Sequence, residues 1–553
     1  MAVAYVWLYG RPVPYMEDWE LVPTLSGATP LRLGWLWEQT VEHHYVLARA
    51  ILYPLWNATR DPRSAMYINA LLLSALALAL ILTARRLRGR VSFADAFFPL
   101  AVLHWAHGET IIFFYSLSFV LPVVQAAAVV MIIATDLWKS RRWALWVLAL
   151  CVALQPLNGG IGLLLAPPLA VWMAYAGAVQ LRTAESGGRR RAAVLIGSAC
   201  ATVLLCALYF VGYQQPVYFA THARTLRGTA RTLVEVLSVA FGSGGAWLWP
   251  YAAILVVLIF AVALCALLVP AAREWPHASR AAGLLACVGA ACLVAAGIAW
   301  GRTVIGPLAG IPARYALLLT PGLFAAYFAA QIYARASLAA LAQFALFACA
   351  LAVLWPNTEV GIEYGRMRAD AADVVIRGVA AGAPSTVLAE RTMGKIYPNT
   401  DALAERLDML RAQRSGPFID AATQYGPCVS TDAALTVIAL NETEVRDGVV
   451  HCLGDDGHID YALARPLDVC GVRVVYSFDA SAAPEADMQL YWMLDGANQF
   501  AEGDRTVSHR VPATPGEHEA TFWIYDRIDR LRIDPDIRPF DIRIVRVEFL
   551  VHQ

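Results

Sequence analysis

Long apolar stretches separated by short polar loops dominate the first 355 residues of this chain. The chain also begins with an apolar run, Ala2 to Tyr9, which brings the expected number of membrane spans to about eleven. A full span needs about 20 residues, so three of these runs are short and the first helix could lack part of its length. The other ten runs cover residues 64–84, 93–106, 111–134, 143–155, 160–179, 192–213, 249–270, 281–300, 315–333 and 338–355.

Composition agrees with this pattern. Hydrophobic residues make up 59% of the 553 positions and charged residues only 16%. The sequence therefore predicts a polytopic α-helical membrane protein that contacts membrane lipid. A formal net charge of zero argues against a nucleic-acid partner. Arg is strongly preferred over Lys, a bias we interpret as that of a high-GC bacterial genome.

The basic residues of the short loops predict an orientation. They cluster in every other loop, at 85–90, 139–142, 182–191 and 273–280. The opposite loops at 107–110 and 155–159 contain none. Because cytoplasmic loops retain positive charge, we expect the amino terminus inside and the carboxyl tail outside, in a bacterial inner membrane. The first loop, residues 11–62, then faces the periplasm.

The chain becomes polar after Trp355, and the remaining residues predict an extracytoplasmic region. Residues 356–420 read as a mixed connecting region, with a helix expected from Thr400 to Gln413 because leucines recur there at helical spacing. Residues 421–553 show alternating apolar positions, which favour a β-sandwich. Near the end, the alternation slips in phase between Ile544 and Val545, as a β-bulge would cause. The expected domains are therefore 1–355, 356–420 and 421–553.

Three cysteines, Cys428, Cys452 and Cys470, lie in this tail, and the other seven lie in apolar segments. An extracytoplasmic tail permits one disulfide. One disulfide would use two of the three cysteines, and the sequence does not show which two.

The acidic cluster around Glu17 and Asp18 is the first candidate for chemistry. A carboxylate near the membrane surface can accept a proton from a sugar hydroxyl as that hydroxyl attacks. A solvated acidic loop is the alternative. Farther along the same loop, aromatic residues accompany Glu42, His43 and His44, and the stretch to Trp56 is amphipathic, as in a helix lying along the membrane.

A short first helix, a Glu-Asp-Trp motif in the first outer loop, the runs Trp-Leu-Trp-Glu-Gln and Glu-His-His, and about eleven spans together resemble the GT-C class of integral-membrane glycosyltransferases. The resemblance covers roughly residues 1–355 and is closest to a largely uncharacterised bacterial group. It implies transfer of a sugar from a polyprenyl-phosphate carrier to a glycan or lipid acceptor of the cell envelope on the outer side.

Carried onto this sequence, the resemblance makes Asp18 the first choice for the catalytic base and Glu17 the second. The group often has Asp-Asp where this chain has Glu-Asp, so the acting carboxylate and the need for a divalent metal, Mg²⁺ or Mn²⁺, stay open. Glu42, His43 and His44 could orient the acceptor, and the two histidines could bind a metal. An interfacial polar face is an equally good interpretation.

A phosphate leaving group needs cations near the outer surface. Arg302 and Arg314 are the preferred candidates, followed by Arg224 and Arg227. The alternative for each arginine is that its side chain merely extends to the membrane–water interface and binds no ligand.

Three polar features of the outer turns are candidates for the same cavity. His107 and Glu109, close to His104, lie in a turn with few other polar residues, and polar groups at membrane depth are by default functional. The loop at 155–160 reads either as a tight outer turn or as a re-entrant turn lining the cavity.

Nucleotide-phosphate loops, catalytic triads and paired zinc ligands are missing from the sequence, which fits a lipid-linked donor. The rival hypothesis is a non-enzymatic protein, either a transporter of envelope polysaccharide or lipid or an assembly scaffold. A transporter should place polar, broken helices at mid-membrane. Here the polar groups gather in outer loops, which favours an enzyme.

Overall fold

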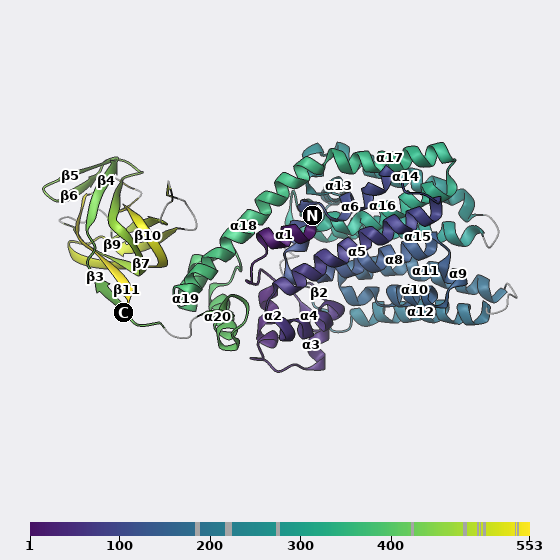
Figure 1. Ribbon diagram of the computed structural model, residues 1–553, viewed down its shortest axis with the longest axis horizontal. Coiled ribbons are helices and arrows are strands. Elements are labelled where there is room, and N and C mark those ends of the chain that lie inside the picture. The colour runs from purple at the N-terminus through teal and green to yellow at the C-terminus, as the bar shows by residue number, and fades with distance from the viewer. Residues whose placement is uncertain are drawn as a thin grey trace. The chain divides into compact units, whose positions relative to one another are not determined.

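The computed structural model describes residues 1–182, 188–215, 224–272, 277–421, 425–478, 484–494, 497, 499–500, 505–536, 538 and 541–553. These residues form two compact units (Figure 1). The first unit combines Met1–Gly10 with Gly27–Arg368, and the second combines Arg11–Ser26 with Ala369–Gln553. Part of the first loop therefore packs with the carboxyl-terminal region rather than with the helices that flank it.

The first unit is helical, and its described residues contain eight candidate spans that are long and apolar enough to cross a membrane. The chain thus has the architecture of a multi-pass membrane protein, but the expected count of eleven is not confirmed. The spans include α5 (Arg63–Arg88), α8 (Leu117–Ala134), α11 (Gly160–Arg182), α12 (Gly188–Tyr209), α14 (Tyr251–Ala271), α15 (His277–Arg302), α16 (Arg314–Tyr333) and α17 (Ala336–Ala352), the last running into α18 (Leu354–Ala380).

The three runs that fall short of this criterion are short or broken helices. The starting run forms α1 (Ala2–Tyr9), and the run at 143–155 forms α10 (Arg142–Ala153). The run at 93–106 is divided into η1 (Phe93–Ala96), α6 (Phe97–Val102) and η2 (Trp105–His107), followed by α7 (Gly108–Ile111) and η3 (Phe114–Ser116).

This broken segment still runs the length of a span. Asp95 at its beginning accepts a hydrogen bond of 2.5 Å from Tyr327, near the end of α16. Glu109 at its other end pairs with Arg314, where α16 begins. The chain therefore passes from one end of α16 to the other through short helical pieces, which a span count based on continuous helices omits.

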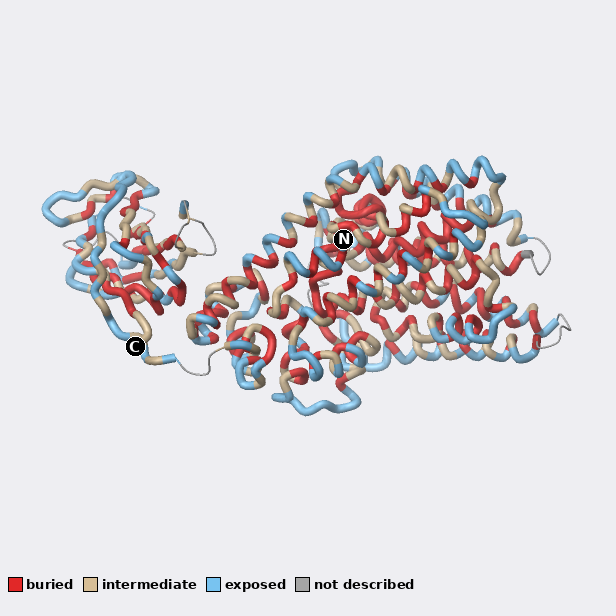
Figure 2. The backbone as a smooth tube through the Cα atoms, in the orientation of Figure 1, coloured by how far each residue is buried: buried red, intermediate tan, exposed pale blue. Residues whose placement is uncertain are grey.

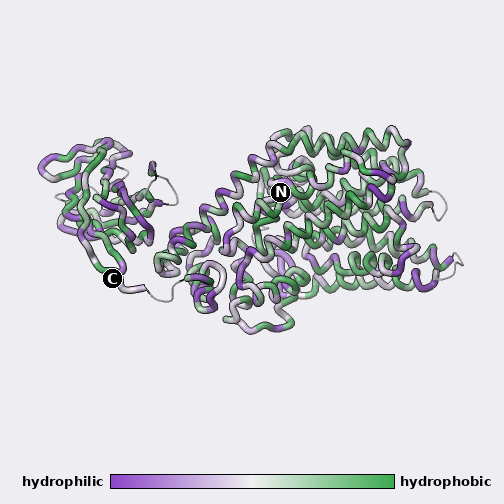
Figure 3. Tube along the Cα trace, viewed as in Figure 1, coloured by the Kyte–Doolittle hydropathy of each residue, from purple (hydrophilic) through white to green (hydrophobic). Residues whose placement is uncertain are grey.

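Helix α16 forms the centre of the unit. Every residue from Tyr315 to Ala329 is buried, against α5, α8, α14, α15 and α17. The outer helices instead expose apolar side chains, such as Leu341 and Phe344 on α17. Figures 2 and 3 show this outer surface of α17 as exposed and hydrophobic. An exposed apolar surface of this kind is suited to lipid rather than to water.

The helices alternate in direction, so their ends collect at two ends of the unit. Arg88 at the end of α5 donates to Gln331 near the end of α16, and Asp136 after α8 pairs with Arg280 near the start of α15. The described residues of the four basic clusters, at 85–90, 139–142, 182–191 and 273–280, therefore lie at one end, which we call the basic end. The membrane face to which it corresponds stays a prediction.

The opposite end, which we call the loop end, carries the part of the first loop that belongs to this unit, from Gly27 onward. Strands β1 (Gln39–Thr40) and β2 (His43–His44) form a short hairpin, preceded by α3 (Leu33–Trp37) and followed by α4 (Val46–Thr59). Arg49 of α4 is buried and donates hydrogen bonds to the Thr40 hydroxyl and the Trp35 carbonyl. The amphipathic helix expected before Trp56 is thus α4, and it fixes the hairpin. The remaining pieces at this end are η4 (Gln155–Asn158), α13 (Leu226–Ser238), η6 (Ser243–Leu248) and η7 (Thr303–Ile305).

The second unit begins with short helices. They are α2 (Asp18–Leu25), the end of α18, α19 (Ser385–Arg391), α20 (Thr400–Gln413) and η8 (Gly416–Phe418). The helix expected at 400–413 is confirmed. Its leucines Leu403, Leu407 and Leu410 are buried, and the Asn399 side chain caps it by accepting a 3.0 Å hydrogen bond from Ala402 N.

Residues beyond 427 form a nine-stranded antiparallel sheet with the order β5-β6-β11-β7-β10-β8-β9, to which β3 and β4 add on β11 and β7. The long strands β7 and β10 each bend and pair in both halves, so the sheet closes over one apolar core. The strands are β3 (Cys428–Thr431), β4 (Leu435–Asn441), β5 (Thr443–Arg446), β6 (Val449–Cys452), β7 (His458–Phe478), β8 (Glu485–Met493), β9 (Thr506–Pro512), β10 (Gly516–Asp534) and β11 (Asp541–His552).

Two expectations for this region are resolved. The register of β11 against β7 shifts between Ile544 and Arg546, which confirms the bulge at Val545. A disulfide joins Cys428 to Cys470, so Cys452 is the free cysteine of the tail.

Candidate active site

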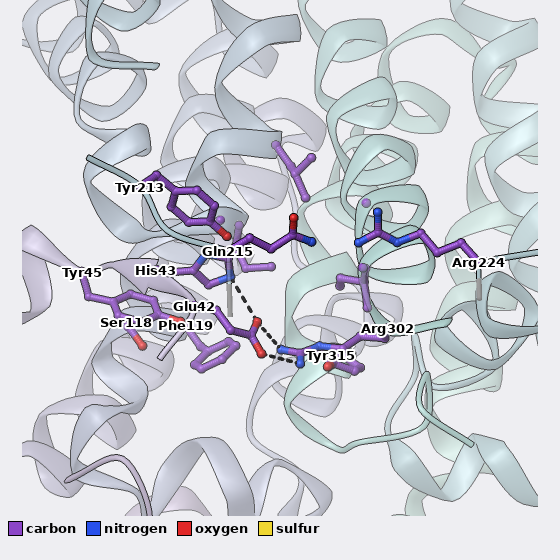
Figure 4. A pocket seen from close by; sticks show the side chains of 16 residues that line it. Glu42, His43, Tyr45, Ser118, Phe119, Tyr213, Gln215, Arg224, Arg302 and Tyr315 are labelled. Carbon is purple, nitrogen blue, oxygen red and sulfur yellow. Dashed lines mark hydrogen bonds and ion pairs between the residues drawn. The ribbon is translucent and has the colours of Figure 1, made fainter. Parts of the chain in front are cut away.

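A cavity of about 220 Å³ opens at the loop end of the first unit (Figure 4). It lies between the first-loop hairpin and the ends of α8, α11 and α15. Ligand sites of drug size have volumes of roughly 300–1,000 Å³, so this one has room for a small head group. Its lining residues are Glu42, His43, Tyr45, Ser118, Phe119, Gly160, Ile161, Leu164, Tyr213, Gln215, Arg224, Gly297, Ile298, Gly301, Arg302 and Tyr315.

A bidentate ion pair lies at the centre of this lining. Arg302 Nη1 donates to Glu42 Oε1 over 2.6 Å, and Arg302 Nη2 donates to Glu42 Oε2 over 2.8 Å. The two side chains are only 11% and 21% exposed for Glu42 and Arg302, respectively. Paired geometry of this kind fixes both groups in orientation as well as in charge. The first loop is therefore tied directly to the end of α15.

His43 places an imidazole beside this pair. Its Nδ1 lies 2.8 Å from the Tyr209 hydroxyl, and its Nε2 lies 3.6 Å from Glu42 Oε2. Burial lowers the pKa of His43 to about 4; Glu42 opposes the shift, and Arg302 and His44 add to it. The ring is therefore neutral near pH 7. The Glu42 carboxylate favours a proton on Nε2, so Nδ1 accepts from Tyr209.

Two glycines make this placement of His43 and Tyr45 possible. A Cβ atom on Gly159 would lie 2.5 Å from the Tyr45 ring, and one on Gly160 would lie 2.5 Å from the His43 ring. Gly159 also has φ +82°, which L side chains rarely adopt. The turn before α11 thus packs directly on the hairpin, and Gly160 lines the cavity, as the second interpretation of the 155–160 loop expects.

The turn is held by buried amides. Gln155 Nε2 donates to the Pro122 carbonyl over 3.0 Å. Asn158 Nδ2 donates to Gln125 Oε1 over 2.8 Å. Both Gln155 and Asn158 are fully buried. Each side-chain nitrogen thus has an acceptor, as a buried donor requires, and these bonds hold the turn beneath His43. The side-chain oxygens of Gln155 and Asn158 have no hydrogen-bond partner among the described residues.

Arg224 supplies a second cation on the far side of the cavity from His43 (Figure 4). Its guanidinium lies 5.3 Å from the centre of the Trp300 ring. Within the described part of the chain, Arg224 contacts no carboxylate. Since Arg302 is neutralised by Glu42, Arg224 is the lining cation most available to an anion.

The walls between these charges are apolar. Phe119, Ile161, Leu164 and Ile298 come from α8, α11 and α15. An amphiphile with an anionic head could therefore place its head between the cations and its chain along the helices. Burial also raises the pKa of the Tyr213 phenol at the rim, and Glu42 adds to the shift.

Four of the predicted residues, Glu42, His43, Arg224 and Arg302, thus meet in one cavity. Arg314 does not line it. Arg314 pairs with Glu109, and its backbone N–H also donates to Glu109 Oε2 over 3.1 Å. This pair fixes the start of α16 and lies outside the lining.

Arg227 faces a different hollow of about 800 Å³. That hollow is also lined by Arg231, Trp249 and Thr303. Arg231 pairs with the buried Glu235, which accepts from the backbone N–H groups of Leu308 and Gly310.

The other two predicted histidines are packed away from the cavity. His44 stacks on Trp37, with ring centres 5.5 Å apart, and its Nδ1 bonds the Trp37 carbonyl. His107 is fully buried, stacks on His104 and bonds the Ala101 carbonyl over 2.9 Å. Both residues support the loop end without lining the site.

Asp18 and Glu17 belong to the second unit. Asp18 is buried and its Oδ2 accepts from Tyr15 N–H over 3.0 Å at the beginning of α2. Glu17 is exposed. Their neighbour Glu20 pairs with Arg406 of α20, which ties this loop segment to the carboxyl-terminal helices.

Ser118, Tyr213 and Gln215 line the cavity and were not expected from the sequence. Tyr213 and Gln215 follow the apolar end of α12, so the only available signal was a change from apolar to polar residues. Gln39 anchors this segment, because its side chain exchanges two hydrogen bonds with the Gln214 backbone, at 2.6 and 2.9 Å.

Two clusters of described side chains have a spacing that could hold a divalent metal ion. In the described residues, three side chains lie close enough to hold an ion in two places, at Cys428, Cys470 and His552 and at Asp456, His458 and Asp534. Both places lie in the sheet, and two of the first three residues form the disulfide. Neither place includes a predicted site residue, so metal dependence stays a prediction.

No protein-family model matches this chain, and no curated protein matches it. Among solved structures, the chain is similar to the arabinosyltransferase EmbB from Mycobacterium smegmatis, with 12% identity and a TM-score of 0.30. The match covers all of this chain and 63% of the EmbB chain. At this TM-score the likeness decides neither fold nor activity, so the function must be argued from the cavity.

Proposed function

We propose that this protein is a GT-C-type membrane glycosyltransferase that transfers a sugar from a polyprenyl-phosphate carrier to a glycan or lipid of the cell envelope. The observation that carries the proposal is the cavity at the loop end, where a carboxylate, a neutral imidazole and two guanidinium groups meet apolar helix walls. Apolar walls suit the hydrocarbon chain of a lipid-linked sugar donor, which a water-soluble nucleotide sugar lacks.

In this proposal Arg224 faces the carrier phosphate and stabilises the charge that develops as the sugar leaves. Arg302 has a second task, since it also holds Glu42. Glu42 and His43 are then placed to orient the acceptor hydroxyl by hydrogen bonding. The isoprenoid chain follows Phe119, Leu164 and Ile298, which are apolar and line the same cavity.

The proton of the acceptor hydroxyl needs a base. Asp18, with Glu17 as second choice, is the base that the first-loop resemblance implies. Glu42 is the carboxylate that lines the cavity, but both of its oxygens already accept hydrogen bonds from Arg302. The two candidates make opposite predictions for substitution, so one assay separates them.

The decisive experiment measures release of polyprenyl phosphate from a panel of labelled polyprenyl-phosphate sugars by the purified full-length protein, with envelope extract as acceptor. We expect turnover with one sugar class. Loss of turnover in Asp18→Asn with Glu42→Gln still active would identify Asp18 as the base, and the reverse would identify Glu42.

Arg224→Gln is expected to raise the KM for the donor, because it removes the lining cation that has no carboxylate partner among the described residues. Arg32→Gln is the matched control, since Arg32 is an exposed first-loop cation outside the cavity lining. Absence of release across the whole panel, from protein that remains folded, would contradict the proposal and favour a transporter or a scaffold.

A further inference from the structure

A second built pocket lies at the basic end of the first unit, far along the helices from the candidate active site. It is a hollow of about 730 Å³ beside the end of α5, the end of α16 and the start of α17. Arg88, Arg90, Phe93, Gln331 and Gln343 are among its lining residues. None of these residues has a part in the proposed transfer reaction.

The floor of this hollow is a closed polar network. Arg88 donates to Asp95 over 2.9 Å and to Tyr327 over 2.7 Å. The same guanidinium donates to Gln331 and to Gln343, each over 3.1 Å. Tyr327 in turn donates to Asp95, and Gln343 donates to Gln331. The charge of Arg88 is therefore neutralised by Asp95, and its other three partners hold the guanidinium in place.

The rim differs from the floor, because two of its cations make no ion pair with any described residue. Arg90 is exposed and, among the residues that the structure describes, contacts no carboxylate. Arg335 lies between the lining residues Ala334 and Ala336 and is likewise exposed without a carboxylate in the described chain. The rim therefore presents positive charge that a bound anion would neutralise.

Apolar side chains stand beside these cations. Phe93 is 93% exposed and Val91 is 62% exposed, and both line the hollow. Leu338 of α17 is 55% exposed next to it. Fully exposed aromatic residues at the end of membrane helices are suited to the interface of a bilayer. The hollow thus combines a positive rim with a surface for acyl chains.

We infer that this hollow binds the headgroup phosphate of an anionic phospholipid. Charge complementarity selects an anionic over a zwitterionic lipid, and the exposed Phe93 and Val91 select a lipid over a free phosphate. Basic pockets between membrane helices bind anionic headgroups in this way. The site does not depend on the proposed transferase activity, because it shares no residue with the cavity at the loop end.

The test is native mass spectrometry of the full-length protein in detergent, titrated with phosphatidylglycerol or phosphatidylcholine. We expect phosphatidylglycerol to bind more tightly, and Arg90→Gln to weaken that binding about fivefold, the change expected for one Arg near an anionic headgroup. Arg142→Gln is the control, since Arg142 is an exposed cation that belongs to another basic loop and does not line the hollow.

A second variant, at another residue of the hollow, distinguishes loss of the binding site from misfolding of the first variant. Ala340 lines the hollow and is exposed, so Ala340→Trp fills the space without changing charge and should also weaken phosphatidylglycerol binding. Equal binding of the two lipids, or equal effects of Arg90→Gln and Arg142→Gln, would overturn the inference. So would competition by glycerol 1-phosphate as strong as that by the lipid, because the site would then hold a free phosphate.

Discussion

Arg302 and Glu42 lie 260 positions apart in the chain, yet the Arg302 guanidinium donates two parallel hydrogen bonds to the Glu42 carboxylate. The pair joins the first-loop hairpin to the end of α15 and closes the cavity between them. Because both side chains are mostly withdrawn from water, neither charge could remain there alone. The pair therefore sets the shape of the site as well as its charge.

Breaking this pair should destabilise the protein. We expect Glu42→Gln and Arg302→Gln each to cost about 3 kcal/mol, because each leaves a mostly buried charge without its partner. The double variant should cost less than the sum, since it leaves no unpaired charge. The free energy of unfolding, measured by titration with a denaturing detergent, checks this.

A control for that cycle exists in the same unit. Arg63 and Asp61 form an ion pair of 2.6 Å in which the Arg63 side chain is 44% exposed. Arg63→Gln should change the free energy of unfolding by less than about 1 kcal/mol. Strictly additive losses for Glu42 and Arg302 would contradict a direct coupling between them.

The turn before α11 offers a test that touches no charged group. In Gly160→Ala the new methyl group would meet the His43 ring, so the imidazole must move. Displacement of a positioned group by about 1 Å can cost about a hundredfold in rate, and we expect a loss of that order in donor turnover. Gly197→Ala is the control, because a Cβ there meets nothing within 4 Å. A Gly160→Ala enzyme of normal rate would remove His43 from the reaction.

The pKa of His43 gives a prediction for stability in acid. Burial holds this pKa at about 4, below its ordinary value of 6.5. Between pH 6.5 and pH 4 the unfolded chain therefore takes up a proton that the folded protein refuses, so stability falls as the pH falls through this window.

His43→Asn should flatten that pH dependence. The asparagine side chain keeps a polar partner for Tyr209 but cannot titrate, so unfolding of the variant should take up about one proton less in this window. Unfolding midpoints of wild type and variant at pH 7 and pH 4.5 measure the difference. Parallel curves for the two proteins would show that His43 takes up its proton equally in the folded and unfolded states, so that its pKa is not lowered by folding.

The features that could be predicted from the sequence are local ones. The helix at 400–413 follows from leucine spacing, and the bulge at Val545 follows from a slip in the alternation of apolar positions. Both depend on residues within one element. The gathering of the outer-loop polar residues at one end of the spans also follows, because consecutive spans alternate in direction and every second loop therefore lies at the same end.

The pairings could not be predicted, because hydropathy carries no information about which loops meet. Arg302 pairs with Glu42 and Arg314 pairs with Glu109, two partners that the sequence did not indicate. Phosphate binding by these arginines stays a prediction. Asp18 was grouped with the membrane loops, whereas its segment packs with the carboxyl-terminal unit. The run at 93–106 was expected to be a short span, and the structure divides it into three short helical pieces.

The Cys428–Cys470 disulfide staples β3 to the middle of β7, across 42 positions of the chain. Closing a loop of this length in the unfolded state stabilises the fold by about 4 kcal/mol on chain-entropy grounds. We therefore expect the Cys428→Ser, Cys470→Ser double variant to lower the free energy of unfolding of the second unit by that amount.

Cys452→Ser provides the comparison. This thiol is buried in the same sheet and burial raises its pKa to about 11, so it is inert while the fold is intact. Reductant should then destabilise the wild type and leave the double variant unchanged, whereas equal sensitivity of both would mean that the disulfide does not form in solution.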